Sequence, residues 1–329
     1  MNRYVLVGTG KDYVKRVWES VITREDVTWF DEPFTISRKP LRVLSHIHSS
    51  FLLNRYFNLP LRGIWEKTSS INQVKINEQD FYYFLLFDNT LARYTPAYIA
   101  DFKRRHQNTA FILFLDNAMH KKERLILQHL GGMDLVYTNN KFDAEKYGFR
   151  YQFNIIPPLA EEEEKNQAIK WDVFFVGNAT DRLDVIHAVY DRLDELGLKT
   201  LMYISGVKPS QISKRKNIIY NQNLPYYKVT EFYEQSRCLL EVVGKKPTML
   251  TMRMMEALRR KKKLLTNHPF ILEQDFYDPR YIQYFNSPGD INKFFFTQNT
   301  DVCYQFQDCS PDSFLKQIVS DYKTSVVNS

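Results

Sequence analysis

The sequence LLEVVGKKPTMLTMRMMEALRRKKKLLTN, residues 239–267, contains the strongest structural pattern in this chain. An apolar strand is followed by a polar loop, by a helix over about 249–260, and by a second apolar strand over 263–267. The helix has an apolar stripe at the helical spacing, formed by Leu250, Met254 and Leu258. A strand, a helix and a strand in this order are typical of the βαβ unit of a parallel sheet.

The same alternation extends through the rest of the chain. In the second half we predict strands over 171–177, 198–206, 217–221 and 238–243, and helices over 182–196 and 229–236. In the first half we predict strands over 3–8, 26–30, 81–88, 110–116, 134–139 and 153–158, and helices over 12–22, 49–57, 95–106, 122–130 and 141–147. The predicted fold class is therefore α/β with parallel sheets.

The length of 329 residues fits two α/β domains of about 150 to 170 residues each. Pro157-Pro158 and the charged, aperiodic segment that follows indicate a linker, or alternatively a surface loop within one domain. We predict two Rossmann-like domains facing a central cleft, residues 1–158 and 159–300, and a helical tail, 301–329, that packs back on the first domain. Such folds bind ligands at the carboxyl ends of their strands.

The predicted helix over 249–260 could bind an anion at its start. Thr248 is the expected N-cap, the first-turn amides are free to donate hydrogen bonds, and Lys246 lies in the loop just before. Arg253 and Glu256 are three residues apart and share one face. A nucleoside diphosphate could place its phosphates on the amides and Arg253, and its ribose on Glu256. The alternative is that Arg253, Glu256 and Arg260 only pair with one another.

The segment MLTMRMMEALRRKKKLLTN, residues 249–267, resembles the donor-binding segment of bacterial GT-B glycosyltransferases of capsule and lipopolysaccharide biosynthesis, G-L-T-M-R-x-x-E-A-L followed by K-K-L-(I/L)-T-x-N. WDVFFVGNATDR, residues 171–182, is similar to the opening of their second domain. The resemblance implies transfer of a sugar from a nucleotide-sugar to a surface-polysaccharide or lipopolysaccharide acceptor. It assigns the donor ribose to Glu256. Many retaining members carry another glutamate where this chain has Thr248, so the stereochemistry stays open.

More donor-binding residues are expected at the carboxyl ends of the other strands of the second domain. The loop over 177–182 could hold phosphate, with Arg182 as an anion clamp, although a simple turn also explains it. Aromatic and polar groups near 203–206 and 223–227 could hold the base, or could be packing residues. The predicted donor-binding residues are Gly177, Asn178, Arg182, Tyr203, Ser205, Lys246, Thr248, Thr251, Arg253 and Glu256.

The first domain is expected to hold the acceptor. Its first strand is followed by a partial glycine loop, in which Tyr13 excludes a dinucleotide fingerprint. The predicted acceptor-side residues are Gly8, Thr9, Gly10 and His46. Transfer with inversion needs a base that takes the proton of the acceptor hydroxyl. Asp116 with His120 is the first candidate pair and Asp88 the next, and the alternative is that the two aspartates cap the following segments.

The composition limits the cofactors and partners. The net charge is +7, with basic runs at 214–216, 245–246 and 259–263 that are expected to attract anions or an anionic inner-membrane surface, or else to be solvated helix ends. No nucleic-acid-binding signature is present, so nucleic acid is not an expected partner. No D-x-D triplet occurs, and His46-x-His48 lacks neighbouring carboxylate or cysteine ligands. We therefore expect no metal and no cofactor beside the nucleotide-sugar.

The expected location is the cytoplasm, with peripheral attachment to the inner face of the plasma membrane. Three cysteines form no disulfide framework, and the sequence shows neither a signal peptide nor a membrane-spanning run. Two other functions stay open at this point. One is a non-catalytic nucleotide-sugar or glycan-binding protein on the same fold, and the other is an enzyme of different chemistry, such as an epimerase.

Overall fold

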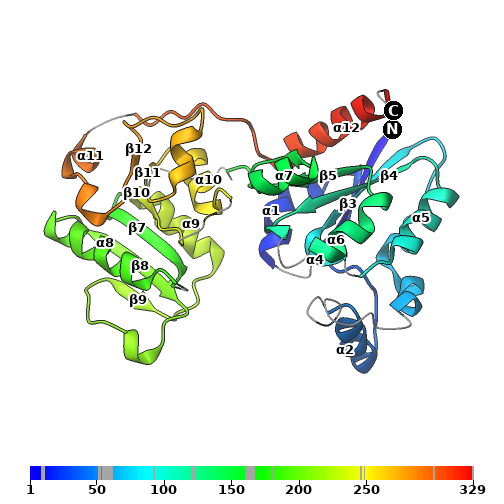
Figure 1. Ribbon diagram of the computed structural model, residues 1–329, viewed down its shortest axis with the longest axis horizontal. Helices are drawn as coiled ribbons and strands as arrows, with labels where there is room; N and C mark the ends of the chain where they lie inside the picture. Colours follow the sequence, from blue (N-terminus) through cyan, green and yellow to red (C-terminus); the bar gives the residue numbers. More distant parts are fainter. Residues whose placement is uncertain are drawn as a thin grey trace. The chain divides into compact units, whose positions relative to one another are not determined.

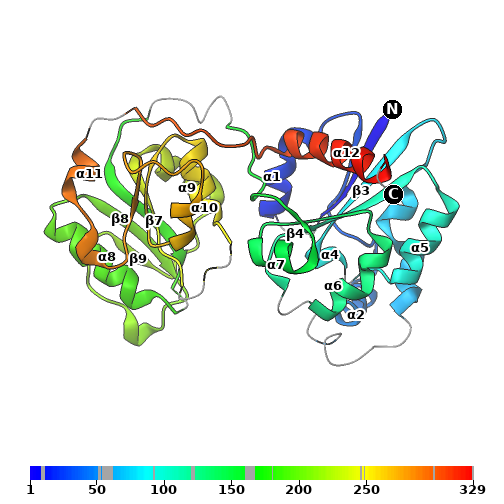
Figure 2. The ribbon, with the colours of Figure 1, turned by 45° about the horizontal axis from the view of Figure 1, so that its top comes forward.

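The computed structural model describes residues 1–8, 12–50, 53, 62–91, 93–119, 123–159, 167–179, 181–244, 247, 249–298 and 301–327. The chain forms two compact units (Figure 1 and Figure 2), of which the first comprises residues 1–157 and 309–329 and the second residues 158–308. Of the segment predicted as a helical tail, residues 301–308 thus belong with the second unit and 309–329 with the first.

The described part of the first unit contains a parallel six-stranded sheet in the order β2-β1-β3-β4-β5-β6. Its strands are β1 (Asn2–Val7), β2 (Val27–Phe30), β3 (Phe81–Phe87), β4 (Thr109–Leu115), β5 (Leu135–Thr138) and β6 (Arg150–Tyr151). This order matches the doubly wound 2-1-3-4-5 arrangement extended by one edge strand. The direction of winding reverses between β1 and β3, where such sheets bind ligands.

Helices cover both faces of the first sheet, which explains why β3 and β4 are apolar along their whole length. One face packs on α1 (Asp12–Ile22) and α12 (Pro311–Val327), and the other on α5 (Pro96–Arg105) and the 3-10 helix η1 (Arg62–Thr68). The remaining described helices are α2 (Lys39–His48), η2 (Ser70–Gln73), α4 (Asp88–Leu91), α6 (Glu123–His129), η4 (Leu130–Gly132) and α7 (Lys141–Tyr147).

The described part of the second unit also contains a parallel six-stranded sheet, in the order β12-β11-β10-β7-β8-β9. Its strands are β7 (Trp171–Asn178), β8 (Thr200–Ser205), β9 (Ile218–Tyr220), β10 (Ser236–Glu241), β11 (Lys263–Thr266) and β12 (Ile282–Tyr284). Counted within the unit, this is the 3-2-1-4-5-6 order of Rossmann folds. The ligand crevice of such a fold opens at the carboxyl ends of the two central strands, here β7 and β10.

The two faces of the second sheet are covered by different helices. Phe175 points into a core with α8 (Leu183–Glu195), and Phe174 packs against Phe232 and Tyr233 of α9 (Tyr226–Glu234), as expected for neighbours on a strand. The other described helices are α10 (Met252–Arg259), α11 (Lys293–Thr297), η5 (Pro209–Gln211), η6 (Pro269–Glu273) and η7 (Pro288–Asp290). The predicted fold class, α/β with two Rossmann-like domains, is confirmed for each unit by its sheet.

Two predicted elements are wrong. Residues 153–158 do not form a strand, because the backbone N–H of Ile156 donates to the carbonyl of Cys309 (3.0 Å) and Pro157 has none to donate. The helix expected over 49–57 lies earlier in the chain, as α2, which begins at Lys39 with Pro40 in its first turn and ends before Ser49. The rest of the predicted range lies largely outside the described residues.

The C-terminal helix completes the first unit. Phe314 of α12 is buried in a cluster of rings, with centroids 6.2 Å from Trp18, 5.5 Å from Phe114 and 5.0 Å from Tyr137. The Tyr137 hydroxyl donates to Asp321 Oδ2 on the same helix (2.7 Å). Residues 309–327 thus close one face of a sheet that begins at residue 2.

Phe314→Ala should destabilise the first unit, because it removes a buried aromatic ring and leaves a cavity. We expect a loss of about 3–5 kcal/mol in the free energy of unfolding. Urea unfolding followed by tryptophan fluorescence measures it. The control is Phe294→Ala, since Phe294 is 64% exposed and should change stability by less than about 0.5 kcal/mol. Equal stabilities of the two variants would contradict the packing of α12.

Candidate functional site

A pocket of about 280 Å³ lies at the carboxyl ends of β7 and β8 in the second unit. Four of the predicted donor-binding residues line it, namely Gly177, Asn178, Tyr203 and Ser205. The loop after β9 forms the other side, with residues 221–224. Asn178 packs on Gly206, where a Cβ would lie 2.8 Å from the amide nitrogen and where φ is +72°, so glycine is required. The pocket therefore occupies the edge of the sheet where ligands bind.

Two arginine side chains converge on Gly177. A Cβ built on Gly177 would lie 3.1 Å from Arg253 Nη2 and 3.6 Å from Arg182 Nη2. The Arg253 guanidinium lies over the Phe175 ring, 4.8 Å from its centroid, which is a cation–π contact. Arg253 comes from the first turn of α10 and Arg182 from the loop before α8. The structure thus brings together two predicted anion-binding residues from the loops after β7 and β10.

Backbone carbonyls hold Arg182 in place. Its Nε donates to the carbonyl of Asn178 (2.9 Å), and its Nη1 donates to the carbonyl of Val242. Asn178 is the last residue of β7 and Val242 directly follows β10, so the guanidinium links these two strands. Carbonyl oxygens carry only a partial negative charge, so they do not neutralise the positive charge of the Arg182 guanidinium.

The positive charges of Arg182 and Arg253 repel each other. Among the described residues, no carboxylate lies within ion-pair distance of either guanidinium. Burial and then the charge of Arg253 lower the pKa of Arg182, while the smaller effects of Asp181 and Glu241 raise it. The Nε–H group of Arg253 is buried and donates a hydrogen bond to none of the described residues. An anion bound between the two guanidiniums would offset their repulsion and would accept hydrogen bonds from their remaining N–H groups.

The start of α10 differs from the prediction. The N-cap is Thr251, whose hydroxyl accepts from the backbone N–H of Met254 (3.4 Å). The same hydroxyl donates to Glu241, a buried carboxylate at the end of β10 that also accepts from Thr266 of β11. Sequence reasoning gave Glu241 no role, because its partner Thr266 is distant in sequence. The predicted N-cap, Thr248, and the predicted donor ligand Lys246 lie outside the described residues.

Glu256 is buried and already has three hydrogen-bond donors. Its Oε1 accepts from the Tyr226 hydroxyl (2.6 Å), and its Oε2 accepts from Arg259 Nη2 (2.6 Å) and Arg260 Nε (2.9 Å). The side chain is 2% exposed. The predicted alternative, pairing of Glu256 with Arg253 and Arg260, thus holds for Arg260, with Arg259 in the place of Arg253. In the structure Glu256 anchors Tyr226, which begins α9 just after the pocket loop, and is closed to a ribose.

Four of the five side chains in the basic run over 259–263 are held by protein partners. Arg260 pairs with Glu234 as well as Glu256, and Lys262 Nζ donates to the carbonyl of Glu234 (2.9 Å). Lys263 is buried, and its ammonium donates to the carbonyls of Phe295 and Gln298 at 2.6 and 2.8 Å. These side chains point inward because α10 packs directly on α9 and β11. Of this run only Lys261 is exposed, so most of it supplies internal contacts, and the attachment to a membrane stays a prediction.

The predicted acceptor-side glycine loop is only partly described. Gly8 donates its N–H to the carbonyl of Phe30 (2.7 Å), and a Cβ on Gly8 would lie 2.7 Å from the Trp29 ring. The glycine is therefore explained by close packing against β2. Thr9 and Gly10 lie outside the described residues.

The three candidates for a catalytic base are placed differently. Asp88 is fully buried at the start of α4 and accepts from Asn117 Nδ2 (3.2 Å), so it links the ends of β3 and β4. Asp116 is half-buried at the carboxyl end of β4. His120 lies outside the described residues, so the predicted pair with Asp116 cannot be described. Of the two aspartates, Asp116 is the less buried.

His46 and His48 are occupied by protein partners. Arg93 Nη2 donates to His46 Nδ1 (2.6 Å), and Trp65 Nε1 donates to His48 Nδ1 (3.0 Å). Burial and the charge of Arg93 lower the pKa of His46. Within the described ranges, no cluster of three or more His, Cys, Asp or Glu side chains is suited to a metal ion. Nor does any helix of those ranges have the length and apolar character needed to cross a bilayer.

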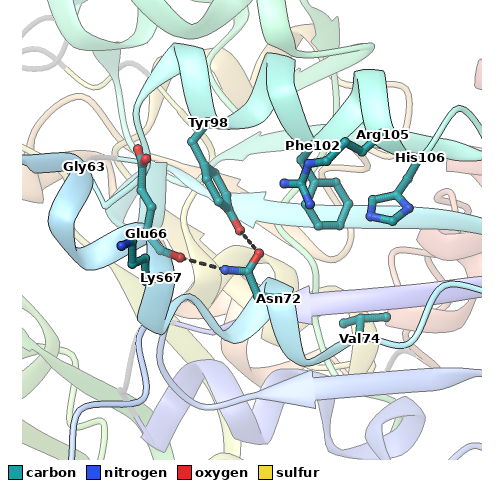
Figure 3. A pocket seen from close by; sticks show the side chains of 9 residues that line it. All are labelled: Gly63, Glu66, Lys67, Asn72, Val74, Tyr98, Phe102, Arg105 and His106. Atoms are coloured by element: carbon teal, nitrogen blue, oxygen red, sulfur yellow. Dashed lines mark hydrogen bonds between the residues drawn. The ribbon is translucent and has the colours of Figure 1, made fainter.

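A second hollow, of about 430 Å³, lies along the flank of α5 in the first unit. Figure 3 shows Tyr98, Phe102, Arg105 and His106 on one side of it, facing Asn72 and the η1 segment on the other. The Tyr98 hydroxyl donates to Asn72 Oδ1 (2.8 Å), and Asn72 Nδ2 donates to the carbonyl of Glu66 (2.7 Å). None of the residues predicted to bind the donor or the acceptor lines this hollow.

No protein-family model matches the chain, and no curated protein sequence matches it. Solved structures do. The structure of apo OtsA is 11% identical, covering 88% of this chain and 88% of that chain, with a TM-score of 0.54. The catalytic domain of starch synthase IV from Arabidopsis thaliana, bound to ADP and acarbose, is 11% identical over 75% of this chain and 73% of that chain, with a TM-score of 0.54.

The chain has the GT-B fold. A structure described as a UDP-N-acetylglucosamine 2-epimerase, from Listeria monocytogenes, is also similar: 10% identical over 98% of this chain and 97% of that chain, with a TM-score of 0.51. Identities of 10–11% establish the fold and leave the reaction open. The GT-B fold is used by glycosyltransferases and by such an epimerase, so the site must decide between them.

Glu256→Ala should destabilise the second unit, because it leaves the buried Arg259 and Arg260 without their shared carboxylate. We expect a loss of about 3–5 kcal/mol in the free energy of unfolding. The control is Glu195→Ala, since Glu195 is 68% exposed and its ion pair among the described residues is with Arg192 of its own helix. Chemical unfolding of both variants measures the difference. A Glu256→Ala variant as stable as the wild type would contradict the buried cluster.

The stability of the wild type should fall on acidification for the same reason. Burial alone would raise the pKa of Glu256, but Arg259, Arg260 and the Tyr226 hydroxyl outweigh it and lower the pKa below 4.5. A lowered pKa contributes stability in full above pH 4.5, and this contribution is lost as the pH falls through the folded-state pKa. Below pH 4.5, the free energy of unfolding should therefore fall more steeply with decreasing pH in the wild type than in Glu256→Gln. Chemical unfolding at a series of pH values measures both slopes. Identical slopes would contradict the shift.

Proposed function

We propose that the second unit binds a nucleotide-sugar and that the chain is a glycosyltransferase. The observation that carries the proposal is the convergence of Arg182 and Arg253 on Gly177, at the wall of a pocket at the carboxyl edge of the sheet. Two cations that share no carboxylate among the described residues suit a diphosphate. The adjoining pocket, lined by Tyr203 and residues 221–224, suits the nucleoside.

The two guanidiniums supply what the reaction needs at the leaving group. When the bond between the anomeric carbon and the diphosphate oxygen breaks, negative charge grows on the diphosphate. Arg182 and Arg253 are already held in place, so they stabilise this charge without reorganising. Handling of the leaving group by arginines supports a metal-independent transfer, as does the absence of a D-x-D triplet from the sequence.

The acceptor hydroxyl must lose its proton as its oxygen bonds to the anomeric carbon. We assign this proton to Asp116, which lies half-buried at the carboxyl edge of the first sheet. His120 stays the proposed partner of Asp116. The assignment of Glu256 becomes that of a positioning residue, which holds Tyr226 and hence the start of α9 next to the pocket loop.

The resemblance of residues 171–267 to capsule and lipopolysaccharide enzymes supports a finer proposal. In it, the acceptor is a surface polysaccharide or lipopolysaccharide precursor, and the chain acts in the cytoplasm at the inner face of the plasma membrane. The donor base and sugar are left unspecified by the residues of the pocket.

A second candidate function is epimerisation of a nucleotide-sugar. It is favoured by the likeness, over nearly the whole chain, to the structure described as a UDP-N-acetylglucosamine 2-epimerase. The two reactions leave different products, because transfer or hydrolysis releases the nucleoside diphosphate and epimerisation keeps it attached. NMR of a sugar-nucleotide mixture after incubation with a membrane extract distinguishes them. Binding without any product would identify a non-catalytic binding protein.

Arg253→Ala should weaken the binding of a nucleoside diphosphate by about 10- to 100-fold, the loss expected for charge-assisted hydrogen bonds. Arg253→Lys keeps the charge but not the planar fork, so its affinity should be intermediate. Isothermal titration calorimetry with UDP, ADP and GDP measures both effects.

The matched control is Arg237→Ala. Arg237 lies near the amino end of β10, on the opposite edge of the same sheet, and is 58% exposed beside Asp172. Its removal changes the net charge equally and should leave the affinity unchanged. Equal losses for the two variants would show that only net charge matters, and no loss for Arg253→Ala would reject the site.

A further inference from the structure

The hollow on the flank of α5 is large enough to hold a small molecule. Its volume of about 430 Å³ falls within the range of ligand pockets, roughly 300–1,000 Å³. Because α5 connects two parallel strands, it begins at the carboxyl edge of the first sheet and returns to the amino edge. The hollow follows the helix along this path, and so it leads away from the edge at which Asp116 lies.

A neutral amide lies at one end of the hollow. Asn72 is exposed, and it links the Tyr98 hydroxyl to the carbonyl of Glu66 through the two hydrogen bonds drawn in Figure 3. Its side chain makes no other hydrogen bond to the described residues. A primary amide has two N–H groups and two lone pairs, so one of each is left for a further molecule. A donor and an acceptor side by side suit hydroxyl groups, which also do both.

Two nitrogen-bearing side chains lie at the other end, both against the Phe102 ring. The Arg105 guanidinium is 5.6 Å from the centre of this ring, and the centre of the His106 ring is 4.8 Å from it. Arg105 Nε donates to Asp101 (3.0 Å), but Asp101 also accepts from Arg104, so one carboxylate serves two guanidiniums. Neither Nη group of Arg105 donates to a described residue. This end therefore has an excess of positive charge and of hydrogen-bond donors.

The carboxylate that lines the hollow does not neutralise this charge. Glu66 accepts from the backbone N–H and the hydroxyl of Thr95, the N-cap of α5. Thr95 and Arg105 are ten residues apart, which is about 15 Å along a helix. Lys67, which also lines the hollow, is exposed and forms no ion pair with a described residue. The charge of the hollow as a whole thus favours an anionic ligand.

We propose that the hollow binds an acidic sugar, that is, a monosaccharide ring that carries a phosphate or a carboxylate. The acidic group accepts hydrogen bonds from the Nη groups of Arg105 and from His106. The sugar hydroxyls pair with the amide of Asn72. The C–H groups of the ring lie against Val74 and Phe102, which supply the apolar part of the lining. Amide, apolar floor and cation thus match the three parts of one ligand.

This site goes beyond the proposed function and does not rest on it. The hollow lies in the first unit, and none of its residues belongs to the donor pocket or to the proposed acceptor site. Sugar phosphates occur as free metabolites, and one bound here acts as an effector. Sugar acids are also units of acidic glycans, and one bound here anchors the glycan away from the reacting hydroxyl. Both ligands use the same contacts, so the experiment includes both.

Isothermal titration calorimetry of the full chain tests the site. The ligands are glucose and galactose, their 6-phosphates, and the corresponding uronates. The wild type should bind at least one phosphate or uronate about tenfold or more tightly than its neutral parent, because the acidic group adds charge-assisted hydrogen bonds. Arg105→Ala should weaken this binding by about 10- to 100-fold. Asn72→Asp keeps an oxygen for the Tyr98 hydroxyl but adds a negative charge, so it should weaken the binding as well.

The matched control is Arg104→Ala. Arg104 shares Asp101 with Arg105, but it is 78% exposed and does not line the hollow. Its removal changes the net charge equally and should leave the affinity unchanged, and urea unfolding shows that each variant is folded. Equal losses for Arg104→Ala and Arg105→Ala would overturn the proposal, because only net charge would then matter.

A second control separates this site from the donor site. Arg253→Ala alters the second unit only, so it should bind the acidic sugar like the wild type. If Arg253→Ala abolished the binding, the acidic sugar would belong to the donor site and the proposal would fall. A wild type that binds no acidic sugar, or binds the neutral parents as tightly, overturns it too. Acidic-sugar binding that depends on Arg105, in a protein without affinity for nucleotides, supports the hollow and rejects the proposed function.

Discussion

Two like charges held side by side are the constraint on which the second unit depends. Arg182 is fixed by carbonyl groups at the ends of β7 and β10, and Arg253 by the Phe175 ring and by its place in the first turn of α10. Their mutual repulsion must be offset by the rest of the structure. Buried carboxylates do this by anchoring α10 at both ends: Glu241 through the N-cap threonine, and Glu256 through the arginines of the last turn.

Charged and apolar side chains do not lie where the sequence pattern predicts: several charged ones are buried and several apolar ones are exposed. The densest basic run, over 259–263, lies largely inside the second unit, where Arg259, Arg260 and Lys262 pair with Glu234 and Glu256. In α2 of the first unit, four apolar side chains are exposed, and the buried residue is the polar Ser45. Sequence spacing specifies that a helix has two faces, but tertiary contacts decide which face meets the body.

The sequence predicts most of this fold because its strands are continuous apolar runs, such as those over 81–88 and 110–116, which match β3 and β4 within a residue at each end. That Gly177, Asn178, Tyr203 and Ser205 lie together at the ends of β7 and β8 was predictable for the same reason. The N-cap was not, since Thr248 and Thr251 offer the same chemistry and only the distant Glu241 distinguishes Thr251. Likewise, the spacing of Arg253 and Glu256 could not show that Tyr226 and two other arginines already occupy the glutamate.

The most direct measurement of the central claim is a crystal structure of the chain with a bound nucleoside diphosphate. The account predicts diphosphate oxygens within about 3 Å of both the Arg182 and Arg253 guanidiniums, the distance of a charge-assisted hydrogen bond. The nucleoside should then extend into the pocket beside Tyr203 and Ser205. A nucleotide bound elsewhere, or one in place while either guanidinium pairs with a protein carboxylate instead, would contradict it.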